Sequence, residues 1–281
     1  MSNLSETSPV TVPSLIAAKG EQRISMLALY DAPAAAAADS AGIDVLLVGD
    51  SVEMALYGRP NTLGATMDMM VRHAQAVSGA ARRALVVGDM PFLSYQADPR
   101  EAVRNAGRFL AEGGCGAVKL EGGQRSLPAL EAILSADIPV MGHVGLTPQS
   151  YRKLGGFKVQ GRGAAAAHAI AEDVRALERA GCFSVVLECV PDTLAAEITR
   201  EASIPTIGIG AGASCDGQVL VFHDVLGLTR NLSPRFVRRY AELGSAMEEA
   251  ARAFREDVRT GAFPSAAESF AAEPHPLRRV R

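Results

Sequence analysis

The chain has 281 residues, 48% of which are apolar, and a formal net charge of −3. This length favours one large domain around a single core, and a (β/α)8 barrel of about 250 residues is a common fold of that size. Because the charge is nearly balanced, no strong field attracts nucleic acid or an anionic membrane, and we expect a small-molecule partner, no nucleic acid and no membrane.

The start of the chain and its cysteines favour a cytoplasmic protein. The first ten residues are polar and lack both the basic cluster and the apolar stretch of a secretory signal. The four cysteines show no closely spaced pairs, which favours reduced thiols. No apolar run reaches the roughly 20 residues of a membrane span.

A short helix is expected at 12–19, before the first of eight apolar runs. Most of these runs are too uniformly apolar to have a solvent-exposed face, which is typical of parallel strands covered on both sides. The runs are 24–29, 43–48, 84–87, 117–120, 139–141, 184–187, 206–209 and 219–222. Helical patterns lie between them, at 31–41, 67–81, 99–112, 127–135, 164–180 and 193–201. A last helix is expected over 234–260, with one apolar face formed by Phe236, Val237, Tyr240, Leu243 and Met247.

The alternation of strands and helices predicts the fold class. We expect an α/β protein, a single (β/α)8 TIM-type barrel with an N-terminal helix and a C-terminal helical extension. In this interpretation residues 13–270 form the catalytic barrel domain, and 1–12 and 271–281 are flexible ends.

Six of the predicted strands end in side chains that can ionise or bind a metal. These endings are Asp50-Ser51, Asp89, Lys119 with Glu121, His143, Glu188 and His223-Asp224. In a barrel of parallel strands the carboxyl ends meet on one face, where catalytic groups assemble from distant parts of the sequence. The pattern therefore predicts an enzyme.

Three of these side chains are single carboxylates on different strands. Asp50, Asp89 and Glu121 together would suit a hard, octahedral cation such as Mg²⁺, with waters and a chelating substrate completing its shell. Any one of them alone would more often cap the following helix or solvate the end of a loop. The set favours a metal site.

Lys119, Glu188 and His143 are the candidates for acid–base chemistry. Lys119 and Glu121 point to the same side of an extended strand, and a buried ammonium needs a carboxylate or anionic ligand beside it. Glu188, partly removed from water, would have the raised pKa of a general base, unless an arginine pairs with it. A lone histidine such as His143 near a strand end is more often structural than catalytic.

Two further features are weaker. The glycine-rich stretch 208–212 resembles a phosphate-cradling loop, but its glycines could equally allow tight turning over the barrel mouth. The pair His223-Asp224 is expected to hold the last loop rather than to contact a substrate.

Several segments of the chain resemble the ketopantoate hydroxymethyltransferase family, also called 3-methyl-2-oxobutanoate hydroxymethyltransferase. The matching segments are LVGDS at 47–51, DMPF at 89–92, VKLEGG at 118–123, PVMGHVGLTPQS at 139–150, GGFKVQGR at 155–162, VLECVP at 186–191 and the run 204–228. They occur in order and span nearly the whole chain, so the resemblance is highly specific.

The resemblance implies a function and roles for the strand-end residues. The family transfers a hydroxymethyl group from the cosubstrate 5,10-methylenetetrahydrofolate to 3-methyl-2-oxobutanoate, giving ketopantoate for pantothenate and coenzyme A biosynthesis. It implies Mg²⁺ bound by Asp50 and Asp89, with Glu121 acting directly or through water. It further implies that Asp50, Ser51, Asp89 and Lys119 hold the 2-oxo acid, that Glu188 is the base, and that His143 lies near the substrate. The resemblance also implies a homo-oligomer, with a decamer of pentameric rings as the family's form.

Some positions depart from the usual family pattern. Glu53 replaces a usual glycine and could repel the substrate anion, adjust metal binding or point outward; the other departures lie at 28–31, 63–66 and 268–270. Two alternatives therefore stay open. One is a lyase or mutase of the phosphoenolpyruvate/pyruvate barrel group, although the Lys-Cys-Gly-His loop of some of its lyases is missing here. The other is a non-catalytic paralogue that binds the oxo acid.

Overall fold

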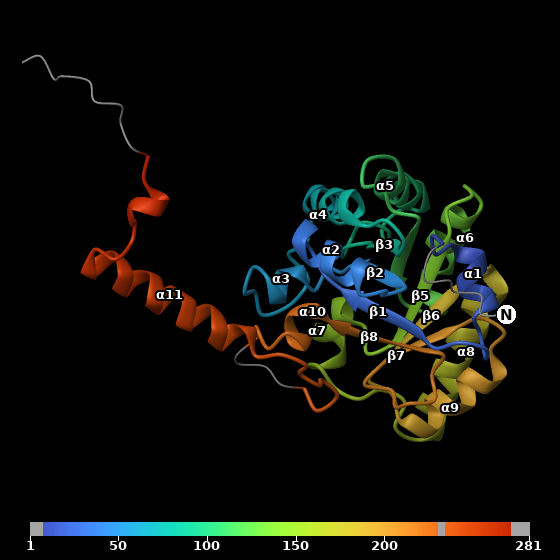
Figure 1. Ribbon diagram of the computed structural model, residues 1–281. Coiled ribbons are helices and arrows are strands. Elements are labelled where there is room, and N and C mark those ends of the chain that lie inside the picture. The colour runs from blue at the N-terminus through green and yellow to red at the C-terminus, as the bar shows by residue number, and fades with distance from the viewer. Residues whose placement is uncertain (1–7, 230–233, 271–281) are drawn as a thin grey trace, which may run out of the picture.

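The computed structural model describes residues 8–229 and 234–270 of the chain. Eight parallel strands close into a barrel in sequence order, each paired with the next, and β8 pairs with β1 (Figure 1). Helices surround this barrel, so the predicted α/β, TIM-type fold is confirmed. Among the described residues no helix is both long and apolar enough to cross a membrane.

The strands agree closely with the predicted runs. They are β1 Ile24–Ala28, β2 Val45–Val48, β3 Leu85–Asp89, β4 Ala117–Glu121, β5 Val140–Gly145, β6 Ser184–Glu188, β7 Thr206–Ile209 and β8 Gly217–Val221. The largest difference is β5, which was expected to end at residue 141. Gly142 and Gly145 have low strand propensity and concealed the rest of this strand, so His143 lies inside β5 rather than after it.

The main helices of the barrel also follow the prediction, and three short helices were not predicted. The main helices are α1 Val12–Ala17, α2 Ala32–Ser40, α4 Met67–Ala80, α5 Pro99–Ala111, α6 Leu127–Leu134, α8 Ala164–Ala180 and α9 Asp192–Glu201. The short ones are α3 Val52–Ala55, α7 Tyr151–Leu154 and α10 Phe222–Val225. Side chains before the first turn start several helices; Asp31, for example, accepts a hydrogen bond from Ala34 N at 2.8 Å.

The predicted helix over 234–260 begins too early. The observed helix α11 spans Leu243–Thr260, so Phe236, Val237 and Tyr240 precede it. Instead of forming helical bonds, Tyr240 N donates to Val225 O at 2.8 Å and Leu243 N donates to Leu226 O at 2.9 Å, which ties this segment to α10. Helix α11 itself projects away from the barrel (Figure 1).

The interior of the barrel is an apolar cluster closed at its amino-terminal end by α1. Leu15 of α1 packs in the same cluster as Met26, Val45 and Ile207. Within the segment expected to be flexible, residues 1–7 lie outside the described part, whereas Val10 is buried and its N–H donates to Arg83 O at 2.7 Å. Residues 271–281, also expected to be flexible, lie outside the described part. The closed bottom leaves the carboxyl-terminal end of the barrel as the open face.

Candidate active site

The predicted strand-end residues line one cavity of about 510 Å³ at the open face of the barrel. Its polar lining includes Asp50, Ser51, Asp89, Lys119, Glu121, His143 and Glu188. Asp224 lines it too, whereas His223 does not. Five of these side chains are each at most 3% exposed: Asp50, Asp89, Lys119, Glu121 and His143. Charges on such buried groups interact with little screening by water.

Lys119 has the carboxylate neighbour that its burial required. Its Nζ lies 2.7 Å from Asp89 Oδ1, across the β3–β4 register that pairs these two residues, and 3.3 Å from His143 Nδ1. Burial acts to lower the pKa of Lys119, but the charges of three carboxylates, led by Asp89, outweigh it and raise the pKa. Lys119 is therefore a fixed positive charge in the cavity floor.

Asp50 and Asp89 lie side by side. Asp50 N donates to Asp89 Oδ2 at 3.1 Å, and burial together with the Asp89 charge raises the pKa of Asp50 to about 7. Two adjacent carboxylates in a buried site repel each other, and a cation would relieve this repulsion.

Glu121 offers an oxygen without a partner. Its Oε2 accepts from Gln149 N at 3.0 Å, whereas Oε1, like Asp89 Oδ1, is buried and accepts no well-aligned hydrogen bond in the described structure. Within residues 8–229 and 234–270, no three His, Cys, Asp or Glu side chains are gathered closely enough to hold a metal alone. Mg²⁺ commonly uses one or two protein carboxylates and takes its other ligands from water and substrate, which fits the Asp50–Asp89 pair.

Glu188 and His143 face each other at the ends of β6 and β5. His143 Nε2 lies 3.1 Å from Glu188 Oε2, without the alignment of a good hydrogen bond. Burial raises the pKa of Glu188 to about 8, while burial and then the Lys119 charge hold the pKa of His143 well below its ordinary value. Because both groups favour their neutral forms, this contact is not a salt bridge. Within the part of the chain that the structure describes, no arginine forms a salt bridge with Glu188.

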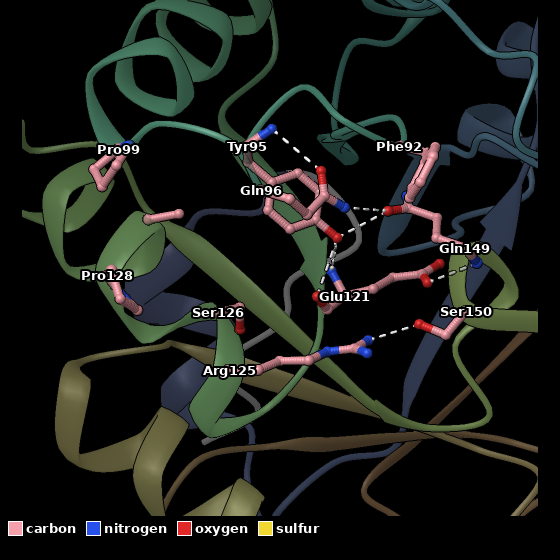
Figure 2. A pocket seen from close by; sticks show the side chains of 11 residues that line it. Phe92, Tyr95, Gln96, Pro99, Glu121, Arg125, Ser126, Pro128, Gln149 and Ser150 are labelled. Atoms are coloured by element: carbon pink, nitrogen blue, oxygen red, sulfur yellow. Dashed lines mark hydrogen bonds between the residues drawn. The ribbon is translucent and has the colours of Figure 1, made fainter. Parts of the chain in front are cut away.

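Gln149 bonds to two of the three carboxylates of the predicted metal site, Asp50 and Glu121, and was not among the predicted site residues. Its Nε2 donates to Asp50 Oδ2 at 3.0 Å and to Met90 O at 2.9 Å, and its Oε1 accepts from Tyr95 OH at 2.8 Å and from Gln96 Nε2 at 3.0 Å. Figure 2 shows Tyr95, Gln96 and Gln149 pointing toward one another beside Glu121. The amide is fully hydrogen-bonded, which fixes its orientation.

This network forms part of a second cavity of about 310 Å³. Glu121 lines both cavities, and Arg125 lines the second one, where its Nη2 donates to Ser150 Oγ at 2.9 Å (Figure 2). The second cavity lies next to the site without containing its lysine or its base.

Glu53 does not line the active-site cavity, although it is only 8% exposed. A Cβ atom added at Gly64 would lie 2.6 Å from Glu53 Oε2, so the carboxylate packs against this glycine. Two departures from the family pattern, at 53 and within 63–66, are therefore neighbours in space.

The glycine-rich stretch turns tightly over the barrel mouth. Gly210 has φ +62°, and a Cβ there would lie 2.9 Å from the ring of Phe236. A residue with a side chain would be strained and crowded at this position. This supports the interpretation that the glycines allow a tight turn.

Comparison with known proteins gives one consistent family. Residues 9–266 match the family model described as ketopantoate hydroxymethyltransferase. The 3-methyl-2-oxobutanoate hydroxymethyltransferase of Oleidesulfovibrio alaskensis is 53% identical over 279 residues, covering 99% of this chain and 96% of that protein. The enzyme of the same name from Moorella thermoacetica is 53% identical over 268 residues, covering 95% of this chain and 100% of that protein.

Solved structures with low sequence identity share the fold. A phosphonopyruvate hydrolase superposes with a TM-score of 0.61 at 13% identity, over 94% of this chain and 92% of that one. A 2,3-dimethylmalate lyase superposes with a TM-score of 0.60 at 18% identity, over 92% of each chain. At this identity the likeness concerns the barrel alone.

Proposed function

The chain belongs to the ketopantoate hydroxymethyltransferase family, and from this we propose that it transfers a hydroxymethyl group from 5,10-methylenetetrahydrofolate to 3-methyl-2-oxobutanoate. The product is 2-dehydropantoate, or ketopantoate. The observation that carries this proposal is a single cavity in which a buried lysine and a carboxylate pair face a carboxylate of raised pKa, Glu188.

The cavity floor would hold the oxo acid. Asp50 and Asp89 are the proposed direct ligands of Mg²⁺. Glu121 is proposed to act through water, for which its buried Oε1, without a well-aligned hydrogen bond in the described structure, offers an acceptor. When bound, Mg²⁺ supplies a Lewis acid that offsets negative charge developing on the substrate's oxygens. Lys119 offsets the same charge from the protein side, and the Ser51 hydroxyl, 2.8 Å from Tyr30 OH, is a further donor in this floor.

Glu188 is the proposed base. In its ionised form it removes the proton from C3 of the oxo acid, and the electron pair of the broken C–H bond moves toward the keto oxygen. His143, held neutral by burial, lies between Lys119 and Glu188 and can accept a hydrogen bond at Nδ1 while Nε2–H faces the base. A neutral imidazole there adds no charge that would compete with Lys119.

The carbon–carbon bond then forms between C3 and the methylene carbon of the folate. The carbon–nitrogen bonds to that methylene break, tetrahydrofolate leaves, and one water supplies the hydroxyl group. Overall, oxo acid, methylenetetrahydrofolate and water give ketopantoate and tetrahydrofolate, so no oxidant or reductant is needed.

Assay of the purified protein tests the proposal. With Mg²⁺, 3-methyl-2-oxobutanoate and methylenetetrahydrofolate it should form ketopantoate. Mg²⁺-dependent binding of the oxo acid without turnover and without exchange of its C3 hydrogen would instead indicate the non-catalytic paralogue. Cleavage of a 2-substituted malate or succinate would indicate the lyase alternative.

We also propose that the protein is a homo-oligomer, with the family's decamer as the expected form. In support, α11 leaves large apolar side chains exposed: Leu243 at 40%, Met247 at 63%, Phe254 at 58% and Val258 at 49%. Several large apolar side chains exposed along one helix are typical of contact sites between proteins. Light scattering coupled to size-exclusion chromatography would measure the state.

A further inference from the structure

The outer part of the active-site cavity differs in character from its polar floor. The apolar lining runs from the buried Leu146 and the β7 residue Ile209 to three exposed side chains, Phe157, Val159 and Phe236, which are 49%, 41% and 37% exposed. The whole cavity, about 510 Å³, lies within the range of about 300–1,000 Å³ that holds drug-sized ligands. A five-carbon oxo acid, whose charged end belongs on the floor, leaves this outer part unfilled.

This apolar part adjoins the proposed base. Ile209 pairs with Glu188 across β6 and β7, and Leu146 N donates to Glu188 O at 2.8 Å. Gln160 N donates to Cys189 O at 2.8 Å, which ties the segment carrying Phe157 and Val159 to the residue after Glu188. A ligand in the outer cavity therefore sits next to the carbon from which Glu188 takes a proton.

Two aromatic rings are held at this mouth by their own neighbours. The Phe157 ring stacks on Tyr151, with centroids 5.7 Å apart and planes at 12°. The Phe236 ring packs against Gly210, where a Cβ would lie 2.9 Å away. Both rings stay partly exposed, at 49% and 37%, so they can receive a planar ligand.

Two cations line the same part of the cavity. Lys158 follows Phe157 and Arg235 precedes Phe236, both side chains are exposed, and neither forms a salt bridge with any described residue. Asp224 contributes one negative charge to the lining. The outer cavity thus combines aromatic surface with two positive charges that have no ion-pair partner in the described structure.

We propose that this outer wall is the subsite for the reduced folate. Its pterin and aminobenzoyl rings lie against Phe157 and Phe236, and the carboxylates of its glutamate tail pair with Lys158 and Arg235. This subsite rests on the proposed function. It adds where the second substrate, the folate, binds and which positive charges of the protein pair with its carboxylates. Because the two cations are exposed, they act mainly on folates with several tail carboxylates.

Charge reversal at the two cations tests the subsite. We expect Lys158→Glu and Arg235→Glu each to raise the KM for methylenetetrahydrofolate about threefold to tenfold, with a larger effect for a triglutamate than for a monoglutamate tail. Added salt should shrink the difference from the wild type. The KM for the oxo acid should not change. Lys153→Glu and Arg238→Glu are matched controls, because both are exposed cations outside the cavity lining.

A second measurement separates this inference from the proposed function. Exchange of the C3 hydrogen of 3-methyl-2-oxobutanoate with deuterium from solvent needs the base but no folate. Normal exchange in both reversal variants, with a raised KM for the folate, supports the subsite. Normal exchange with an unchanged KM for both tail lengths overturns the subsite and leaves the function intact. Absence of exchange and turnover in the wild type overturns the function itself.

Discussion

His143 Nε2 lies 3.1 Å from Glu188 Oε2, and burial favours the uncharged form of both groups, raising the pKa of Glu188 to about 8 and lowering that of His143. Neutral forms avoid the large cost of burying an isolated charge. Glu188 must ionise to act as the base, and its raised pKa means that it ionises only at higher pH than an ordinary glutamate. The activity and the stability of the protein should therefore both depend on pH through this residue.

The first prediction concerns the pH dependence of catalysis. Since Glu188 works as a carboxylate, kcat/KM for the oxo acid should rise with pH and reach half its limit at about pH 8, the pKa in the free enzyme. Glu188→Gln should lower the rate of C3 hydrogen exchange by about 10²- to 10⁴-fold. Deuterium incorporation measured by NMR from pH 6 to 9 checks both, and a flat profile would contradict the assignment of the base.

The second prediction concerns stability at the same residue. The pKa of Glu188 rises from 4.5 to about 8 on folding, so the folded state prefers the protonated form. The stability linked to this preference is fully present below about pH 4.5 and is lost as the pH rises through about 8. The metal-free Glu188→Gln variant should therefore gain Tm relative to the wild type as the pH increases from 5 to 9. Thermal scans at both pH values measure this, and an equal difference at both would disprove it.

Metal dependence gives a third prediction, at Asp89. Asp89→Asn removes a proposed Mg²⁺ ligand and also the partner of Lys119 at 2.7 Å. Because loss of an outer partner of a metal ligand already costs about 10–100-fold, loss of the ligand should weaken Mg²⁺-dependent binding of the oxo acid by at least that factor. Calorimetry with and without EDTA measures it. Asp68→Asn, at an exposed carboxylate, is the matched control and should bind like the wild type.

The residues at strand ends could be predicted from sequence because barrel geometry alone brings them together. Asp89, Lys119 and Glu188 each end or interrupt an apolar run, so their position on the open face follows from the run. Gln149 could not be found this way, since an amide in a loop interrupts no periodic pattern and its role depends on three-dimensional neighbours. The predicted start of the last helix was wrong for a related reason. The spacing of Phe236 and Tyr240 fits a helix, but the backbone N–H of Tyr240 bonds to Val225 of α10 instead of to a carbonyl of its own segment.

A fourth prediction follows from the hydrogen bonds of Gln149. Gln149→Leu would leave Asp50 Oδ2 and Met90 O without this partner, and each unsatisfied buried group costs about 1–3 kcal/mol. Tyr95 OH can still donate to Glu121 O at 3.0 Å. We expect lower stability and weaker Mg²⁺ binding because Asp50 loses its orientation. Gln149→Glu should weaken stability less at pH 5 than at pH 8, since a carboxyl there must stay protonated beside Asp50. Urea unfolding and calorimetry distinguish these outcomes, and unchanged Mg²⁺ affinity in both variants would rule out a positioning role.

The last prediction treats Glu53 and Gly64 as one coupled pair. A Cβ at residue 64 would lie 2.6 Å from Glu53 Oε2 and 3.1 Å from its Cδ, so Gly64→Ala must displace a buried carboxylate. Because a carboxylate at the end of a flexible side chain can move, we expect a modest loss of about 0.5–1.5 kcal/mol, within the range of coupling between contacting residues. With Glu53→Ala already present, Gly64→Ala should cost much less, since no carboxylate then occupies the space. A double-mutant cycle by urea unfolding measures the coupling, with Gly79→Ala as a control because a Cβ there meets nothing within 4 Å. If the effects of the two substitutions on the free energy of unfolding are additive, the side chain of Glu53 does not need a glycine at residue 64. The departures from the family pattern at 53 and 64 would then be structurally unrelated.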